Sequence, residues 1–268
     1  MLNRMRRNNP NDIETTCEDE GYGPAVVLLH GYPFNRTMWR DQIAVLKDQY
    51  RVVAPDLRGL GESIAADTVA GMDQMAREVA TLMDQLQIDQ AVIAGLSMGG
   101  YVAFEFQHFF PDRVKALVLA GTRAPADNDQ ERQTRERQAA RMLAHGMAGI
   151  AAETLPKLLA QETLARNPAA VDRIREMIDS TSPHGAAAAQ LGMAARRDYS
   201  EDLENINVPT LIIVGTEDSI RPVSDAEFMH SRIADSQLKI MENAAHVSNF
   251  DQPEVFNATL REFLTAVA

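Results

Sequence analysis

The stretch that decides the fold is AVIAGLSMGGYVAFEF, residues 91–106. It begins with a continuous apolar run, Ala91–Ala94, which is typical of a strand covered on both faces. The chain then passes through the turn GLSMG (95–99) into a segment with helical composition, Tyr101–His108. Such a sharp turn needs small residues on both sides, because side chains do not fit there. The sequence therefore predicts a strand–turn–helix unit that lifts the Ser97 hydroxyl above the end of a sheet.

Similar strands and helices alternate along much of the chain. Short apolar runs predict further strands at Ala25–Leu29, Tyr50–Ala54, Val114–Ala120, Thr210–Val214 and, more weakly, Gln237–Met241. Apolar residues at three- and four-residue steps predict helices from Met72 to Leu86 and from Val255 to Phe263. This alternation predicts an α/β fold with a mostly parallel central sheet flanked by helices.

The alternation stops after Gly121. Residues 123–197 show no strand pattern, are rich in Ala, Arg, Met and Leu, and are nearly neutral, whereas the rest of the chain is strongly acidic. We therefore predict a helical cap at 123–197, inserted between two parts of one core, 1–122 and 198–268. Residues 1–11 are expected to form a flexible arm, and the candidate for a first strand is Ile13–Cys17.

Composition limits the partners of this chain of 268 residues. Its 26 Lys and Arg against 38 Asp and Glu give a net charge of −12, which argues against binding nucleic acid or an anionic membrane surface. No apolar run approaches the ~20 residues of a membrane span. The basic start lacks the apolar stretch of a secretory signal. The lone Cys17 excludes an intramolecular disulfide, so we expect a cytoplasmic protein.

A serine hydroxyl needs a base to become a nucleophile, and the base needs an acid to orient it. His246 lies just after the last predicted strand and is the candidate base. Asp218 follows the strand at 210–214 and is the candidate acid, with its neighbour Glu217 as the alternative. The remaining helical or inserted histidines are expected to be surface or packing residues; they are His108, His145, His184 and His230.

Sites of a different kind are less well supported. A dinucleotide-binding turn would need Gly where Ser97 stands, and no Gly-x-x-x-x-Gly-Lys loop is present. No His-Glu-x-x-His motif or clustered Cys and His set is present either, so no metal or organic cofactor is expected.

A second turn follows the first buried strand, in His30-Gly31-Tyr32-Pro33. The backbone N–H groups of Tyr32 and Met98 are candidates for the two donors that hold an oxyanion. His30 is a candidate for substrate contact, and packing beneath the turn is the alternative.

With these residues in place, the chain resembles the α/β-hydrolase superfamily. The resemblance rests on four blocks: LLHGYPFNRTMW, PDLRGLGES, GLSMGGYVAFEF, and VGTEDSIRP with NAAHVSNFDQPEVF. It implies Ser97, Asp218 and His246 as nucleophile, acid and base, and the backbone of Tyr32 and Met98 as oxyanion donors. Among its members the chain is similar to small bacterial capped esterases, aryl esterases and enol-lactonases. Related branches that use Asp as nucleophile are disfavoured.

The resemblance implies hydrolysis of carboxylic esters or lactones through an acyl-enzyme. An apolar cap wall that includes Met142 and Met147 predicts small to medium apolar acyl groups. A different hypothesis is that a substrate carboxylate is recognised, as in an enol-lactonase, by Arg132, Arg135, Arg137 and Arg141, although a solvated helix face is the plainer interpretation. Cleavage of a carbon–carbon bond would be a second enzyme activity for such a site. A ligand receptor with slow turnover would be a function of another class.

Overall fold

The computed structural model describes residues 2–4, 15–63 and 69–267 of the chain. The described residues form one eight-stranded sheet in the order β1-β2-β4-β3-β5-β6-β7-β8. The strands are β1 (Leu2–Arg4), β2 (Thr16–Glu20), β3 (Ala25–Leu29), β4 (Arg51–Pro55), β5 (Ala91–Leu96), β6 (Val114–Ala120), β7 (Thr210–Gly215) and β8 (Ser236–Met241). All neighbouring pairs from β4 to β8 are parallel, which confirms the predicted fold class.

The six strands predicted from apolar runs are β3 to β8, and their bounds agree to within two residues. The middle strands are buried along most of their length, as expected for a parallel sheet covered on both faces. Because β3, β5, β6 and β7 are neighbours and parallel, the loops that follow them meet at one edge of the sheet.

The expectation for the N-terminal region needs correction. Leu2–Arg4 is not part of a flexible arm but forms β1, which pairs antiparallel with β2. The rest of that arm, residues 5–11, lies outside the described residues, as do residues 13 and 14. The first long strand is Thr16–Glu20 rather than Ile13–Cys17. Its sequence TCEDE is mostly polar, and its place is determined by antiparallel backbone pairing with β4 rather than by an apolar pattern.

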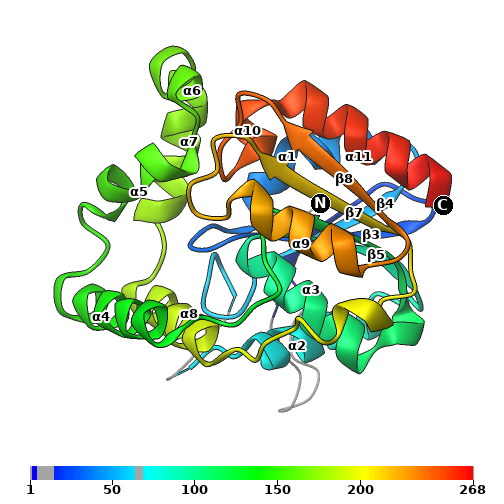
Figure 1. Cartoon of the computed structure of the whole chain (residues 1–268), viewed down its shortest axis with the longest axis horizontal. Coiled ribbons are helices and arrows are strands. Elements are labelled where there is room, and N and C mark those ends of the chain that lie inside the picture. The colour runs from blue at the N-terminus through cyan, green and yellow to red at the C-terminus, as the bar shows by residue number, and fades with distance from the viewer. Residues whose placement is uncertain (1, 5–14, 64–68, 268) are drawn as a thin grey trace.

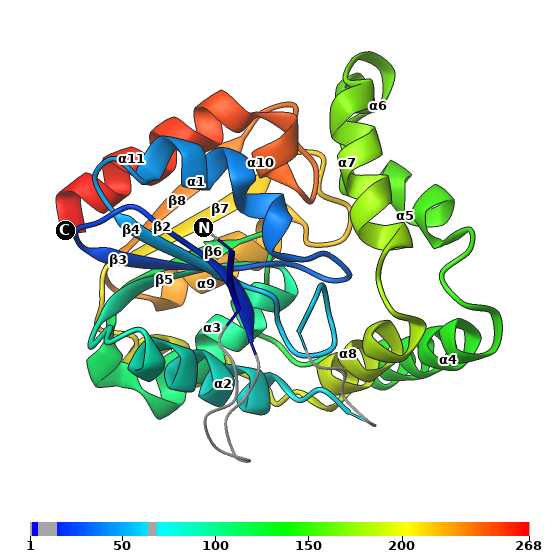
Figure 2. The same ribbon diagram turned by 180° about the vertical axis from the view of Figure 1, so that it is seen from behind.

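Helices cover both faces of the sheet (Figures 1 and 2). One face is covered by α2 (Met72–Gln85), α3 (Met98–Phe109) and α9 (Val223–Arg232). The other is covered by α1 (Arg40–Leu46), α10 (Ser248–Asp251) and α11 (Pro253–Val267). Short 3-10 helices lie at Arg36–Trp39, Pro111–Arg113 and Leu203–Asn205. Each face therefore has its own apolar core, and neither layer covers the edge where the strands end.

Five helices lie between β6 and β7 and stand beyond the carboxyl ends of the strands (Figure 1). They are α4 (Asp129–His145), α5 (Ile150–Leu158), α6 (Gln161–Arg166), α7 (Pro168–Asp179) and α8 (Pro183–Ala195). We refer to residues 129–195 as the helical insertion. In it, α4 packs along α8, while α5, α6 and α7 pack together. Two groups of helices thus face each other beyond the carboxyl edge of the sheet.

Both groups are attached to the core. On the α8 side, the backbone N–H of Ala70 donates to the carbonyl of Ala188 at 3.0 Å. On the α5 side, the N–H of Val247 donates to the carbonyl of Leu158 at 3.0 Å. The hydroxyl of Thr181, just after α7, donates to the carbonyl of Pro33 at 2.7 Å. None of the helices in the described ranges is long and apolar enough to cross a bilayer.

Candidate active site

Ser97 lies at the turn between β5 and α3, in an unusual backbone conformation with φ 56° and ψ −112°. A side chain on either flanking glycine would not fit: a Cβ at Gly95 would lie 2.2 Å from the Gly99 carbonyl oxygen, and one at Gly99 would lie 2.2 Å from that of Leu29. The N–H of Ser97 donates to the Ala120 carbonyl at 2.8 Å. The turn is therefore held by backbone contacts with two neighbouring strands, and a positive φ at a non-glycine residue is costly unless its surroundings impose it.

The structure brings Ser97, His246 and Asp218 together in one hydrogen-bonded series. His246 Nε2 lies 2.8 Å from Ser97 Oγ, and His246 Nδ1 lies 2.9 Å from Asp218 Oδ2. Both His246 and Asp218 are buried. Because a carboxylate only accepts, Nδ1 carries the proton and donates to Asp218, which leaves Nε2 free to accept from the Ser97 hydroxyl. This tautomer is the one that can remove a proton from a serine.

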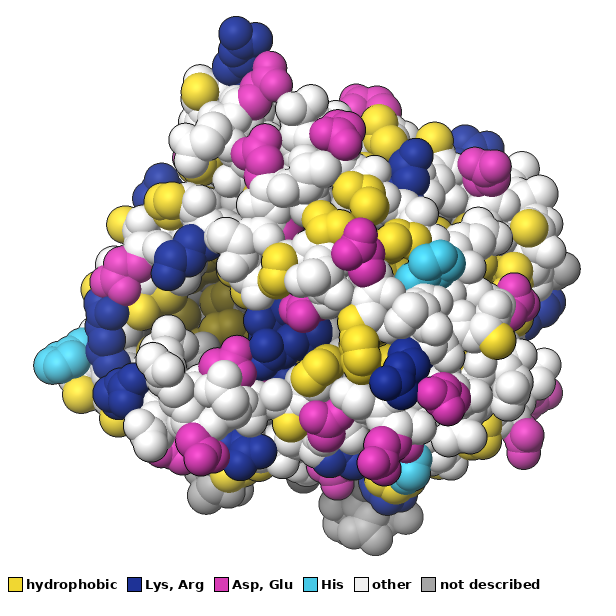
Figure 3. All heavy atoms as spheres, viewed as in Figure 1, with side chains coloured by type: hydrophobic (Ala, Val, Ile, Leu, Met, Phe, Trp, Pro, Cys, Tyr) yellow, Lys and Arg dark blue, Asp and Glu magenta, His cyan; other side chains and the backbone are white. Residues whose placement is uncertain are grey.

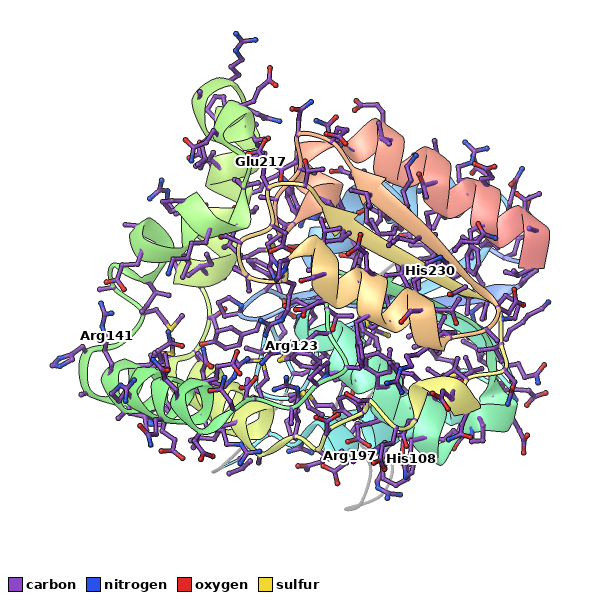
Figure 4. The ribbon with its side chains drawn as sticks, viewed as in Figure 1. His108, Arg123, Arg141, Arg197, Glu217 and His230 are labelled. Carbon is purple, nitrogen blue, oxygen red and sulfur yellow. The ribbon has the colours of Figure 1, made fainter. Side chains whose placement is uncertain are left out.

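The second oxygen of Asp218 is held by the backbone. Its Oδ1 accepts from the N–H groups of Ile220 at 2.9 Å and Arg221 at 2.8 Å. The neighbouring carboxylate, Glu217, is exposed and points toward α6, where it accepts from the N–H of Gln161 at 3.4 Å (Figure 4). Asp218, and not Glu217, is therefore the acidic group at His246.

Tyr32 and Met98 carry the backbone N–H groups that the sequence predicts as oxyanion donors. Met98 is the first residue of α3, where helical N–H groups have no intrahelical acceptor. Tyr32 follows β3, the neighbour of β5, and Gly99 packs against the carbonyls of Leu29 and His30. Neither N–H donates a hydrogen bond to a described residue. Both N–H groups are therefore available to a bound ligand.

A cavity of about 260 Å³ opens above Ser97 and His246, between the core and the helical insertion. Figure 3 shows it as a hollow between α4 and α5, with apolar side chains on its floor and Lys or Arg side chains at its rim. Its apolar lining includes Met142 on α4, Ile150 and Leu158 on α5, Met193 on α8 and Ile220 from the core. The Tyr32 hydroxyl also lines it and donates to the Met142 sulfur at 3.1 Å, which joins the core to α4.

Two of the residues predicted to contact substrate, His30 and Met147, do not line the cavity. His30 is fully buried and does not line the cavity: its Nε2 accepts from the N–H of Leu57 at 2.9 Å, and its Nδ1 donates to the Gly31 carbonyl at 2.9 Å. Burial lowers the pKa of His30, which keeps it neutral in this packing role. Met147 is buried in the apolar core that includes residues of α1 and α11. It does not line the cavity either, whereas Met142 does.

The four arginines of α4 separate into two pairs. Arg135 and Arg141 line the cavity, whereas Arg132 and Arg137 lie outside it, with Arg137 exposed. Successive helical residues point in different directions, so a cluster in sequence is not a cluster in space. Figure 4 shows Arg141 on α4 near the end that faces α5.

Of the four histidines expected to be surface or packing residues, none lines the cavity; they are His108 on α3, His145 on α4, His184 on α8 and His230 on α9. All four are exposed. Among the described residues, no group of three or more His, Cys, Asp or Glu side chains is placed to hold a metal ion.

Sequence reasoning missed Arg221 and Lys157, which also line the cavity. Lys157 belongs to the apolar-patterned α5, and nothing in that pattern shows that a charged residue on this helix borders the cavity. Arg221 stands three residues after Asp218, at the carboxyl edge of the sheet where ligands gather in α/β folds. Its position after Asp218 was the available signal.

Comparisons with known proteins agree with this geometry. A family model described as alpha/beta hydrolase fold matches residues 24–253. A 3-oxoadipate enol-lactonase from Acinetobacter baylyi is 31% identical over 234 residues, covering 87% of this chain and 86% of that protein.

Two solved structures are similar over nearly the whole chain. An esterase from Thermogutta terrifontis, determined with malate bound, has 42% identity and a TM-score of 0.94, and covers 96% of this chain and 95% of its own. An enol-lactonase from Burkholderia xenovorans LB400 has 28% identity and a TM-score of 0.89. The match covers 95% of this chain and 98% of the enol-lactonase chain. With the family model matching most of its length, this chain belongs to the α/β-hydrolase family.

Proposed function

We propose that this protein is an enzyme that hydrolyses carboxylic esters or lactones through an acyl-enzyme on Ser97. The observation that carries the proposal is the hydrogen-bonded series Ser97–His246–Asp218, in which Ser97 and His246 line the cavity. The relatives named esterase and enol-lactonase support the same reaction class.

In the proposed mechanism, His246 takes the hydroxyl proton as Ser97 Oγ attacks the substrate carbonyl. Asp218 holds the imidazole in place and stabilises the imidazolium. The N–H groups of Tyr32 and Met98 donate to the oxyanion of the tetrahedral intermediate. His246 then protonates the leaving alcohol, and in the second half-reaction it activates the water that releases the acid.

The helical insertion is proposed to act as a cap over this site, within the boundaries 123–197 expected from the sequence. A cavity of about 260 Å³ with Met142, Ile150 and Leu158 in its wall favours small to medium acyl groups. With Cys17 as the chain's one cysteine, we propose a cytoplasmic location, where thiols stay reduced.

The test is steady-state hydrolysis of p-nitrophenyl esters from acetate to dodecanoate, with Ser97→Ala measured beside the unmodified enzyme. We expect the highest kcat/KM for short to medium chains, because longer chains exceed the cavity. Ser97→Ala should reduce turnover of every ester to near background. A folded, unmodified protein that turned over no ester or lactone would contradict the proposal.

A further inference from the structure

The cavity wall carries an excess of positive charge, although the whole chain has a net charge of −12. Four cationic side chains line it against one carboxylate; they are Arg135, Arg141, Lys157 and Arg221 against Glu153. In an acidic protein, this local reversal of sign marks the cavity as a place where negative charge is favoured.

Two of the four cations already have carboxylate partners. Arg135 forms an ion pair with the buried Asp127, and Arg141 forms a two-pronged ion pair with Glu153 on α5. Lys157 is exposed, so water solvates its ammonium group. These three charges are therefore matched or solvated without a ligand.

Arg221 is different. Only 9% of the residue is exposed, and no carboxylate among residues 15–63 and 69–267 forms an ion pair with it. Arginine is rarely buried without an anionic partner, because removing its charge from water is costly. The carboxylate of Asp218 is occupied by His246 and two backbone N–H groups. Burial raises the pKa of the nearby Asp225 carboxyl, and the charges of Arg123 and Arg221 offset only part of this rise.

Neutral groups fix the guanidinium of Arg221 in place. Its Nε and Nη2 donate to the hydroxyl of Tyr101 at 3.1 and 2.7 Å, and its Nη1 donates to the Ile220 carbonyl at 2.7 Å. A guanidinium has five N–H donors, so two remain without an acceptor among the described residues. The side chain is thus preorganised, and its remaining donors can bind a ligand without losing further conformational freedom.

The surrounding potential is positive as well. Burial raises the pKa of the Tyr101 phenol, but the charges of Arg221, Arg196 and Arg135 lower it more, so its pKa lies below the ordinary value. A phenol that ionises more readily than usual in a buried place shows that negative charge is stabilised there.

We propose that Arg221 binds a carboxylate of the substrate, so that the preferred substrates are esters or lactones that carry a second, ionised carboxyl group. This inference rests on the proposed function and assigns the specificity of the same site to a residue outside the helical insertion. Arginine suits this task because its planar fork matches the two oxygens of a carboxylate.

The test compares two substrates of the same shape, 4-acetoxybenzoate and its neutral amide, 4-acetoxybenzamide. We expect kcat/KM to be on the order of 10- to 100-fold higher for the carboxylate, the range given by a buried charge-assisted hydrogen bond. Arg221→Gln should bring the ratio of the two kcat/KM values close to one. Arg221→Lys, which keeps the charge but not the fork, should give an intermediate ratio.

The matched control is Arg137→Gln. It removes one positive charge from an exposed position outside the cavity, so the ratio should stay at the unmodified value. If Arg137→Gln lowers the ratio as much as Arg221→Gln does, the preference comes from the general charge of the protein and the proposal is wrong. It is equally wrong if the unmodified enzyme does not distinguish the two substrates.

A binding measurement separates this inference from the proposed function. Calorimetric titration of the unmodified protein with glutarate and with its diamide reports on the anion site without any turnover. Tighter binding of glutarate, weakened by Arg221→Lys, supports the inference even if Arg221→Gln does not fold. Hydrolysis of both esters with equal binding of the two ligands would overturn it while leaving ester hydrolysis in place.

Discussion

The core holds its reactive side chains through backbone packing, whereas the helical insertion holds its cavity-lining side chains through ion pairs and side-chain hydrogen bonds. Ser97 is positioned by close backbone contacts between β5, α3 and β3, and Asp218 by two N–H groups of its own loop. Arg135 is held by Asp127 and Gln190, and Arg141 by Glu153. We therefore expect substitutions in the core to affect the reaction itself, and those in the insertion to affect selectivity and stability.

The largest expected effect concerns the base in the core. His246→Ala should lower kcat/KM for a short p-nitrophenyl ester on the order of 10⁴-fold or more, because Ser97 loses its proton acceptor. The control is His230→Ala on α9, an exposed histidine that contacts Ser236 and lies away from the cavity (Figure 4). Activity of His246→Ala within about tenfold of the unmodified enzyme would remove His246 from the mechanism.

A pair of glycine substitutions compares the two regions directly. Gly95→Ala in the core places a Cβ against the backbone of Gly99 and Gly100, which cannot yield without moving the turn. We expect a loss of unfolding free energy of about 4 kcal/mol or more, at the upper end for single substitutions.

The matched variant in the insertion is Gly149→Ala, at the start of α5. Its Cβ meets no atom within 4 Å and strains only its backbone, at φ +81°. Gly149→Ala should lower the unfolding free energy by about 1–2 kcal/mol. Denaturant unfolding of both variants measures the difference, and equal losses would show that the core turn tolerates movement.

A smaller effect than that of Gly95→Ala is expected at the base of the helical insertion. Asp127 is buried and forms ion pairs with Arg123 at 2.8 Å, with Arg196 at 2.6 Å and with Arg135. Asp127→Asn leaves these guanidinium groups without their shared carboxylate and should cost about 3 kcal/mol of unfolding free energy. The control, Glu153→Gln, breaks an exposed ion pair and should leave the unfolding temperature unchanged within error.

The effect of Asp127→Asn should depend on pH. Burial raises the pKa of the Asp127 carboxyl, but Arg135 and Arg196 lower it more, so its pKa in the folded protein lies well below the ordinary value. The carboxylate therefore stabilises the fold above about pH 4, the ordinary value for Asp, and this contribution is lost as pH falls further. The difference in unfolding free energy between Asp127→Asn and the unmodified protein should be constant at neutral pH and should shrink below pH ~4. A gap that widened in acid would refute this role of Asp127.

Most of the core was predictable because buried parallel strands are nearly continuous apolar runs. β3 to β7 were found in this way, β8 was found from a weaker pattern, and the turn after β5 identified Ser97. By contrast, the bounds of β2 were not predicted. Its residues are mostly polar, and its position depends on pairing with β4, which lies much later in the sequence. Sequence patterns report local periodicity well, and they report such long-range pairing poorly.

Site residues were predictable where a reactive side chain directly follows a predicted strand. They were not predictable where the role of a side chain depends on partners far away in the sequence. His246 and Asp218 follow β8 and β7, and the shared edge of a parallel sheet brings them to Ser97. The sequence left two roles open for His30, because its partner, the N–H of Leu57, comes from the loop after β4. Arg221 was missed because its contact with Tyr101 joins positions 120 residues apart.

The most direct test of the central proposal is stopped-flow hydrolysis of p-nitrophenyl acetate at high enzyme concentration. If Ser97 forms an acyl-enzyme whose hydrolysis is slower than its formation, the first turnover appears as a burst of p-nitrophenolate. We predict a burst amplitude equal to the concentration of active sites and its loss in Ser97→Ala. A burst that survives in folded Ser97→Ala would contradict the proposal and place the nucleophile elsewhere in the molecule.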